Sequence, residues 1–207
     1  MNDYSIKMNI MLSKNSMLII GFLLKNPTKM YNVNQISKEL DISIGSAHKI
    51  AKELFSKGII KSEKQGNNIF YKLDMKNKET RKICEIFLIE DKNRKLSQNK
   101  TAKIYSNELE NFPAKAVVLF GSVLTKPEKS NDVDVLFVIK NKKDVEKVSD
   151  FCLKLSKLKT RPIVPLIMAE TDMTEKLKEK NPVVLGIIKT GVVLSGEEAI
   201  IGVLSNV

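Results

Sequence analysis

Two residue types that build small metal and disulfide sites are almost missing from this sequence of 207 residues. It contains two cysteines, Cys84 and Cys152, and a single histidine, His48. The cysteines lack the CxxC spacing of zinc sites and are too few for a disulfide framework. We therefore expect two reduced, buried thiols, and we expect His48 to be a partly buried packing residue with no metal to bind.

Long apolar runs are missing as well. The longest, residues 17–24, is far shorter than the roughly 20 residues that a helix needs to cross a bilayer. The N-terminus lacks a signal-peptide cleavage pattern, and no internal repeat or low-complexity tract interrupts the chain. These absences argue against a membrane protein and predict a cytoplasmic one.

The charge balance is strongly basic. Thirty-five lysines and arginines face 24 aspartates and glutamates, which gives a net charge of +11 and a pI near 9.5. Such an excess favours a polyanionic partner such as nucleic acid, although a lysine-rich proteome would produce it without any partner. The length allows one large or two modest domains.

The first third of the chain shows the periodicity of three helices followed by two strands. Helices are predicted at 16–25, 34–40 and 44–57, and strands at 59–64 and 69–73 with a Gly/Asn turn between them. In the third helix the apolar positions are expected to turn inward, namely Ile44, Ala47, Ile50, Ala51 and Leu54.

This order resembles the winged helix-turn-helix domains of small bacterial and archaeal transcription regulators, and it predicts such a domain at 1–75. The resemblance implies DNA binding with the helix at 44–57 in the major groove. We expect Ser46 to reach a base edge and the lysines to hold phosphates. The predicted contacts are Ser43, Ser46, Lys49, Lys52, Lys61 and Lys64. A protein-interaction or dimerisation role stays open, and a homodimer is the usual state for reading palindromic sites.

A charged, helix-friendly segment follows at 76–111. Its apolar stripe is thin, so we interpret it as a helical linker of one or two connecting helices. Such a segment either dimerises with its copy or spaces two domains, and the sequence does not choose between these roles. The basic cluster at 92–95 is interpreted as a solvated face.

Beyond residue 112 two apolar strands enclose a polar turn. The strand at 116–120 ends at Gly121 and Ser122, and in the next strand Asp132 and Asp134 project from one face. Two unpaired carboxylates so close would repel each other, and Mg²⁺ would resolve the conflict. Gly121 lets a ligand approach the backbone, and Ser122 begins a short helix that can seat a phosphate.

The spacing Gly-Ser, nine residues, Asp-x-Asp resembles the minimal nucleotidyltransferases of the polymerase-beta-like superfamily. The resemblance implies an α+β protein whose domain at 112–207 holds a small mixed sheet. It implies that Asp132 and Asp134 bind Mg²⁺ and that Gly121 and Ser122 hold the phosphates of a nucleoside triphosphate, ATP being the first choice. The acceptor of the nucleoside monophosphate is unknown, with a partner protein among the candidates. The alternative is a β-hairpin with two solvated aspartates.

A third carboxylate, which the family carries on the strand after the intervening helix, is not where the resemblance requires it. That helix is predicted at 142–158, and the following strand, 162–168, is wholly apolar apart from its prolines. The nearest acids are Glu170, which we take as the catalytic candidate, and Asp172. If neither reaches the metal, the chain is a transcriptional regulator whose degenerate domain senses nucleotide or a partner. Its status as an enzyme stays open.

Overall fold

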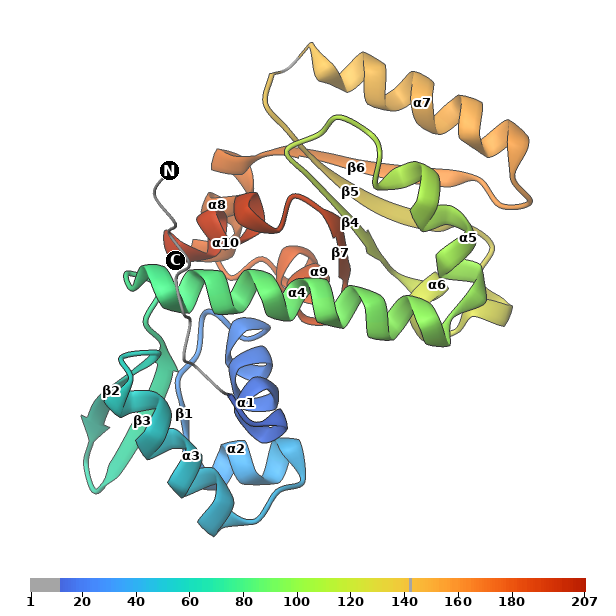
Figure 1. Ribbon diagram of the computed structural model, residues 1–207. Coiled ribbons are helices and arrows are strands. Elements are labelled where there is room, and N and C mark those ends of the chain that lie inside the picture. The colour runs from blue at the N-terminus through green and yellow to red at the C-terminus, as the bar shows by residue number, and fades with distance from the viewer. Residues whose placement is uncertain (1–11, 142) are drawn as a thin grey trace, which may run out of the picture.

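The computed structural model describes residues 12–141 and 143–207. The start of the predicted N-terminal domain, residues 1–11, and the first residue of the helix predicted at 142–158 lie outside the described residues. A small N-terminal unit and a larger sheet-containing unit lie on opposite sides of one long helix, α4 (Lys78–Gln98), as Figure 1 shows.

The N-terminal unit is a winged helix-turn-helix, which confirms the prediction. Its element order is α1 (Lys14–Leu24), β1 (Tyr31–Asn32), α2 (Val33–Leu40), α3 (Ile44–Ser56), β2 (Ile60–Gln65) and β3 (Asn68–Leu73). The three strands form an antiparallel sheet in the order β1-β3-β2, and the β2–β3 hairpin is the wing.

Polar side chains at the helix starts define these boundaries. Ser13 caps α1 by accepting a hydrogen bond from the backbone N–H of Ser16 at 3.1 Å. Asn32 and Gln35 cap α2 reciprocally, each side chain accepting from the backbone N–H of the other, at 2.9 and 3.0 Å. Such caps satisfy N–H groups that have no partner inside the helix.

The C-terminal unit is built on a mixed four-stranded sheet in the order β6-β5-β4-β7. Its strands are β4 (Ala116–Phe120), β5 (Val133–Ile139), β6 (Ile163–Ala169) and β7 (Val192–Ser195). Only β5 and β6 run parallel, and α7 (Asp144–Leu158) connects them. The predicted α+β class and mixed sheet are therefore confirmed, whereas the nucleotidyltransferase fold stays a prediction.

Helices cover both faces of this sheet. One face, which includes Val135 and Phe137, packs against α5 (Lys100–Leu109) and α7. The other face, which includes Leu136 and Val138, packs against α8 (Glu170–Lys178), α9 (Pro182–Thr190) and α10 (Glu197–Ser205). The short helix α6 (Ser122–Thr125) and a 3₁₀ turn (Pro127–Lys129) complete the connection from β4 to β5.

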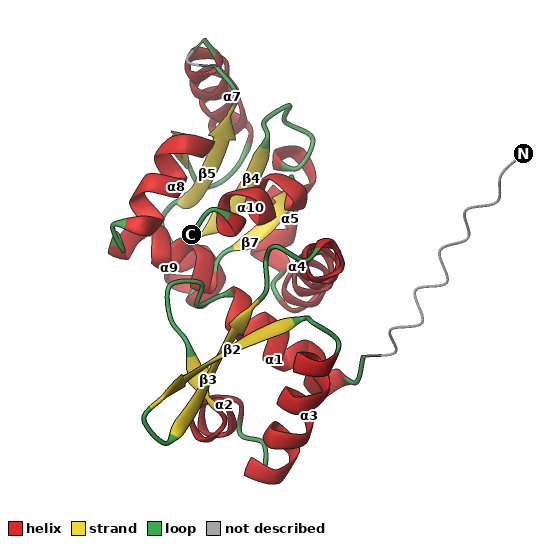
Figure 2. Cartoon of the chain, turned by 90° about the vertical axis from the view of Figure 1, so that its left-hand side faces the viewer, coloured by secondary structure: helices red, strands yellow, loops and turns green. Residues whose placement is uncertain are grey.

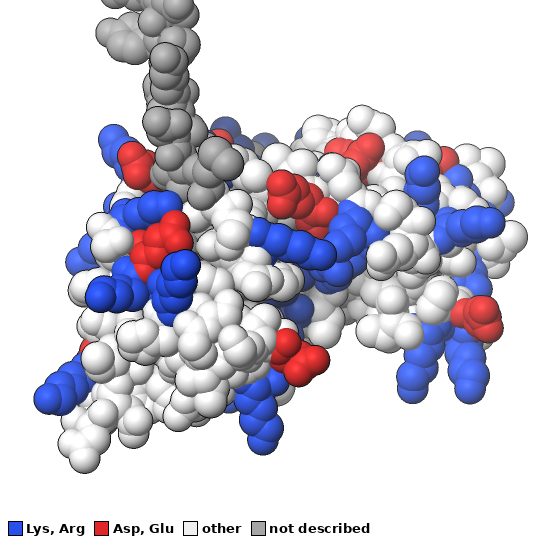
Figure 3. Space-filling model, turned by 60° about the horizontal axis from the view of Figure 1, so that its bottom comes forward, with Lys and Arg blue, Asp and Glu red and all other residues white. Residues whose placement is uncertain are grey.

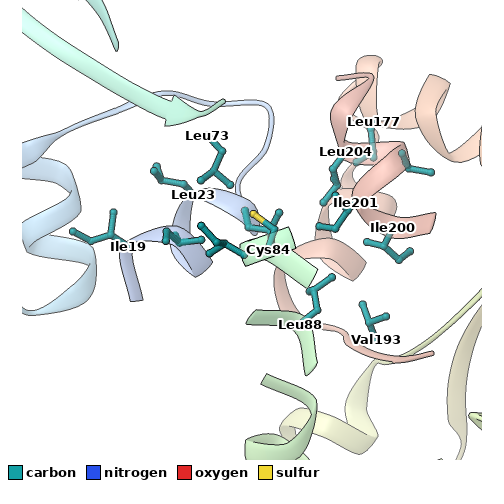
Figure 4. Packing of buried hydrophobic residues seen from close by; sticks show 14 of the residues in the cluster. Ile19, Leu23, Leu73, Cys84, Leu88, Leu177, Val193, Ile200, Ile201 and Leu204 are labelled. Carbon is teal, nitrogen blue, oxygen red and sulfur yellow. The ribbon is translucent and has the colours of Figure 1, made fainter. Parts of the chain in front are cut away.

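Helix α4 does more than connect the two units, because one hydrophobic cluster continues across it. Cys84 and Leu88 are buried between α1 on one side and α10 on the other. Figure 4 shows Ile19 and Leu23 on the winged-helix side of these residues and Ile201 and Leu204 on the far side. In Figure 2 the same helix is seen nearly end-on between the two units.

A buried ionic cluster reinforces this junction. Asp91 of α4 is 3% exposed and forms ion pairs with Lys25 at the end of α1, with Arg94 at 2.5 Å and with Lys95 at 3.2 Å. Burial by itself would raise the pKa of Asp91, but the charges and hydrogen bonds of Lys25 and Lys95 hold that pKa below its ordinary value. The carboxylate therefore stays ionised in the interior.

The prediction that the cluster at 92–95 is a solvated face is wrong for two of its lysines. The ammonium group of Lys92 donates to the carbonyl oxygen of Leu194 at 2.9 Å, and that of Lys95 donates to the carbonyl of Thr190 at 3.1 Å. Both side chains lie along the sheet unit and tie α4 to the ends of β7 and α9.

The two cysteines are buried thiols, as predicted. Cys84 and Cys152 are both buried and form no disulfide. Burial raises the pKa of the Cys84 thiol to about 12 and that of Cys152 to about 11, so both stay protonated. None of the helices within 12–141 and 143–207 is long and apolar enough to cross a membrane.

Candidate nucleic-acid interface and carboxylate site

The turn between α2 and α3 sets the direction of the second helix of the motif. Asp41 adopts a left-handed conformation with φ of 51°, which aspartate tolerates better than most residues. The Ser37 hydroxyl donates to the carbonyl of Ile42 at 2.6 Å. Ser43 then caps α3, because its Oγ accepts from the backbone N–H of Ser46 at 3.2 Å.

The outward face of α3 differs from the predicted one at two positions. Ile44 was expected in the core but is 58% exposed, and His48, expected to be partly buried, is exposed as well. The first turn of α3 extends beyond the surface against which Ala47, Ile50 and Leu54 pack, so the apolar spacing at its start does not lead inward. Ile44 directly follows the cap residue Ser43, and this position, which the helical periodicity did not take into account, could have indicated that its side chain is exposed.

Four of the predicted DNA contacts lie on or next to this helix. Lys49 and Lys52 are exposed and project from the outward face, Ser46 is half-buried, and Ser43 is exposed while its oxygen serves the cap. Together with Ile44 and His48 they form a face that combines an apolar side chain, an imidazole and two ammonium groups.

The other two predicted DNA contacts, Lys61 and Lys64, lie on the wing but on opposite faces of it. Lys64 is exposed near the tip of the hairpin, opposite Ile69. Lys61 is three residues away, so its side chain projects from the opposite face of the strand. There it is paired with Lys72 and lines a cavity near α10. The structure therefore does not bring Lys61 together with Lys49, Lys52 and Lys64.

Figure 3 shows the molecule with the winged-helix end brought forward. On this face lysine and arginine side chains are dispersed among uncharged and acidic ones and do not merge into one basic surface. The positive charge near α3 is therefore limited to a few side chains. If this helix met a nucleic acid, phosphate contacts would be few and contacts to base edges would have to supply part of the affinity.

The second candidate site lies where β4 ends and β5 begins. Gly121 has φ of 81°, and a Cβ at this position would lie 2.0 Å from Oδ2 of Asp134. A larger residue would be strained here, because φ is positive and the carboxylate occupies the space of a side chain. The glycine thus permits the carboxylate to lie directly against the β4–α6 turn.

Hydroxyl groups hold the turn that leads into β5. The Ser122 hydroxyl donates to Oγ of Ser130 at 3.0 Å, and the buried Ser130 hydroxyl donates to the carbonyl of Asp132 at 2.5 Å. This chain fixes the backbone of Asp132 relative to Ser122. The four predicted residues of the site, Gly121, Ser122, Asp132 and Asp134, are therefore brought together.

The electrostatics of the pair follow from this geometry. Burial, followed by the charge of Asp132, raises the pKa of Asp134 above its ordinary value. Both effects penalise the ionised carboxylate, and a cation placed between the two groups would remove the repulsion.

The third carboxylate is not at this site. In the parallel register of β5 and β6, Asp134 lies beside Val164, whose side chain shares its face and is 44% exposed. Glu170 is the first residue of α8, just past the end of β6 and six residues after Val164, which in extended chain corresponds to about 20 Å. It forms an ion pair with Lys115, and Asp172 accepts a hydrogen bond from the backbone N–H of Ala169 at 3.3 Å. The structure brings neither acid to the Asp132–Asp134 pair.

The donor set fits a single hard cation better than a pair of metals. No cluster of three or more His, Cys, Asp or Glu side chains with metal-binding geometry occurs in the part of the chain that the structure describes. Mg²⁺ needs only one or two protein carboxylates when phosphate oxygens and water fill its remaining positions. The site is therefore suited to a cation that arrives with a phosphorylated ligand.

The two candidate sites lie far apart. In Figure 1 the helix α3 is at the lower left, whereas α6, which follows Gly121, is at the right-hand end of the molecule. The outward face of α3 and the carboxylate pair are therefore separate sites.

Comparisons with known proteins give little beyond this geometry. No protein-family model matches the chain, and no curated protein matches it. Among solved structures, the adhesin competence repressor AdcR of Streptococcus pyogenes is 14% identical, with 72% of this chain and 84% of that chain covered and a TM-score of 0.34. The zinc-responsive MarR family member ZitR of Lactococcus lactis is 15% identical, with coverage of 73% and 79% and a TM-score of 0.33. Likenesses of this size establish neither a shared overall fold nor a shared function.

Proposed function

We propose that the chain is a DNA-binding regulator whose C-terminal unit binds a Mg²⁺–nucleotide complex as a ligand without transferring it. The observation that carries the first half is the exposed face of α3, because a core helix would not leave Ile44 in solvent. At the N-terminal end of a helix in the major groove, an apolar side chain suits a thymine methyl group, and Lys49 suits guanine or phosphate.

The double variant Lys49→Gln/Lys52→Gln tests the DNA-binding half. We expect weaker binding to duplexes selected from a random-sequence pool, and the slope of log K against log salt should become shallower by about 2, close to one per lysine removed. The measurement is fluorescence anisotropy at several salt concentrations.

The matched control is Lys154→Gln/Lys157→Gln, which removes the same charge from the exposed surface of α7. Its salt slope should equal that of the wild type. If both double variants changed binding equally, α3 would not be the DNA-contacting helix. A palindromic target would require two copies of the chain on the DNA.

The second half of the proposal rests on the geometry of Gly121, Asp132 and Asp134. A cation bound between the carboxylates would supply positive charge for the phosphates of a nucleoside triphosphate, for which ATP is the first candidate. Gly121 and Ser122 would then position the terminal phosphates against the β4–α6 turn. Val164, in place of an acid, offers no base to deprotonate an attacking hydroxyl. Binding without transfer is therefore the expected behaviour.

Incubation with Mg²⁺ and α-labelled ATP, with and without cell extract, tests this half. We expect Mg²⁺-dependent retention of the nucleotide on the protein and no covalent transfer of label. Retention should be lost in Asp132→Asn/Asp134→Asn and kept in Glu146→Gln/Asp150→Asn, which removes two charges from the exposed surface of α7.

Covalent label on any acceptor, including a partner protein from the extract, would instead establish a nucleotidyltransferase. That second function would use the same packing of Asp134 on Gly121. The variant Val164→Asp adds a carboxylate beside Asp134 in the register of the sheet and should raise the affinity for Mn²⁺ about tenfold.

A further inference from the structure

Two adjoining cavities lie where the base of the wing meets the C-terminal helices. Their volumes are about 150 and 230 Å³, and they share Pro27, Lys29, Lys72 and Val207 in their walls. Together they lie within the size range of small-molecule sites, which begins near roughly 300 Å³. Neither cavity includes a residue of the α3 face or of the carboxylate site.

Every charged side chain in the described walls is a lysine. Lysines reach the cavities from the loop after α1, from both wing strands, from the segment after β3 and from the end of α8. They are Lys29, Lys61, Lys72, Lys76, Lys178 and Lys180. Among the described residues, no aspartate or glutamate side chain lines either cavity, and none forms an ion pair with these lysines. Six ammonium groups with no acidic side chain among them favour an anion, and Lys61 and Lys72, which are half-buried, are the least screened by solvent.

The floor of the cavity of about 150 Å³ is apolar. Leu23 and Leu73 come from the winged helix, Met75 from the segment after β3, and Leu204 from α10. Figure 4 shows Leu23 and Leu73 facing Leu204 across the junction of the two units. An apolar floor beneath a rim of lysines recognises a molecule with both a hydrophobic body and a negative group.

We propose that these cavities form the binding site of a small organic anion, a carboxylate or phosphate ester carried on an apolar or aromatic body. Its body would lie on the leucine floor, and its charged group would contact Lys61 and Lys72, which are neighbours across the β2–β3 ladder and are half-buried. Such a ligand would contact the wing and α10 at the same time. It would therefore stabilise one position of the wing relative to the sheet unit, and its effect on DNA rests on the proposed function.

Three probes separate the requirements of the site: 1-naphthyl phosphate has both parts, 1-naphthol has the ring alone, and inorganic phosphate has the charge alone. The chain contains no tryptophan, so naphthalene fluorescence reports binding without overlap. We expect 1-naphthyl phosphate to bind at least about tenfold more tightly than either fragment. Equal binding of inorganic phosphate, or no binding of 1-naphthyl phosphate, would overturn the proposal.

The double variant Lys61→Gln/Lys72→Gln locates the site. It should weaken binding of 1-naphthyl phosphate by about tenfold, because two partly desolvated charge contacts are lost. Lys29→Gln/Lys76→Gln on the exposed rim provides a second variant should the first one unfold. Unchanged affinity in a folded cavity variant would place the probe elsewhere and refute the site.

The α3 variant Lys49→Gln/Lys52→Gln separates failure of this site from failure of the DNA-binding proposal. It should bind 1-naphthyl phosphate like the wild type, because neither lysine lines the cavities. Naphthyl phosphate binding without any DNA binding would support the site and refute only the regulator. The reverse result would refute the site and leave the regulator standing.

Discussion

Replacing Asp91 by alanine is expected to lower the free energy of unfolding by about 3–5 kcal/mol. The carboxylate is 3% exposed and is the only acid paired with Lys25 and Lys95 among the described residues. Its removal leaves the partly buried ammonium groups of Lys25 and Lys95 without their acidic partner, and such a loss costs more than breaking a surface ion pair.

Urea denaturation followed by circular dichroism measures the effect. Asp150→Ala serves as the control, since Asp150 is exposed on α7 and forms no ion pair with a described residue. Its stability should stay within about 0.5 kcal/mol of the wild type. Equal stabilities of the two variants would show that the cluster does not hold the winged helix to α4.

The same cluster makes the free energy of unfolding depend on pH in both the acidic and the basic range. Because the pKa of Asp91 is lowered, its contribution is present above the ordinary aspartate value and is lost as the pH falls through the folded-state pKa. Burial, followed by the charge of Lys95, lowers the pKa of Lys25 from 10.5 to about 8. The unfolded chain then keeps this proton to higher pH, so the contribution of Lys25 becomes more favourable as the pH rises between these values.

Substituting alanine for Gly196 is expected to cost about 2–4 kcal/mol of stability. Gly196 has φ of 79°, and a Cβ there would lie 2.0 Å from the carbonyl oxygen of Lys115 and 2.5 Å from Cα of Ala116. Both contacts are with backbone at the start of β4, which cannot move aside without disturbing the sheet.

Gly202→Ala inside α10, the helix that follows Gly196, is the matched control and should change stability in the opposite direction. No atom lies within 4 Å of its Cβ position, and alanine is favoured over glycine in a helix interior by about 0.5–1 kcal/mol. Thermal unfolding of the two variants side by side measures the difference. A loss of stability in both would mean that α10 tolerates no added side chain, and the clash at Gly196 would then not be its specific cause.

Local features of this fold could be predicted from the sequence because they depend on neighbours in the chain. The strand at 116–120, its end at Gly121 and the start of α3 at residue 44 all follow from periodicity and from residues within four positions. Pairing of Asp132 with Asp134 on one face follows in the same way from the alternation of a strand.

Features that depend on contacts between distant segments could not be predicted. The apolar residues of α4 are divided between two partners, α1 and α10. Each side of the helix therefore carries only a narrow apolar stripe, which in the sequence is typical of a linker and not of a core helix. Lys92 and Lys95 find carbonyl oxygens about 100 positions away. The register that places Val164 beside Asp134 depends on a parallel pairing that the sequence does not encode locally.

The hydrophobic cluster that continues across α4 makes the predicted boundary at residue 75 a poor place to divide the chain. A fragment ending there would expose Ile19, Leu23 and Leu24 to water, and the remainder would expose the apolar side of α4 together with Ile201 and Leu204. Each half completes the interior of the other. A recombination event that exchanged the N-terminal half for an unrelated module would leave these apolar side chains without a matching surface. Substitutions on the two sides of α4 are therefore expected to be coupled.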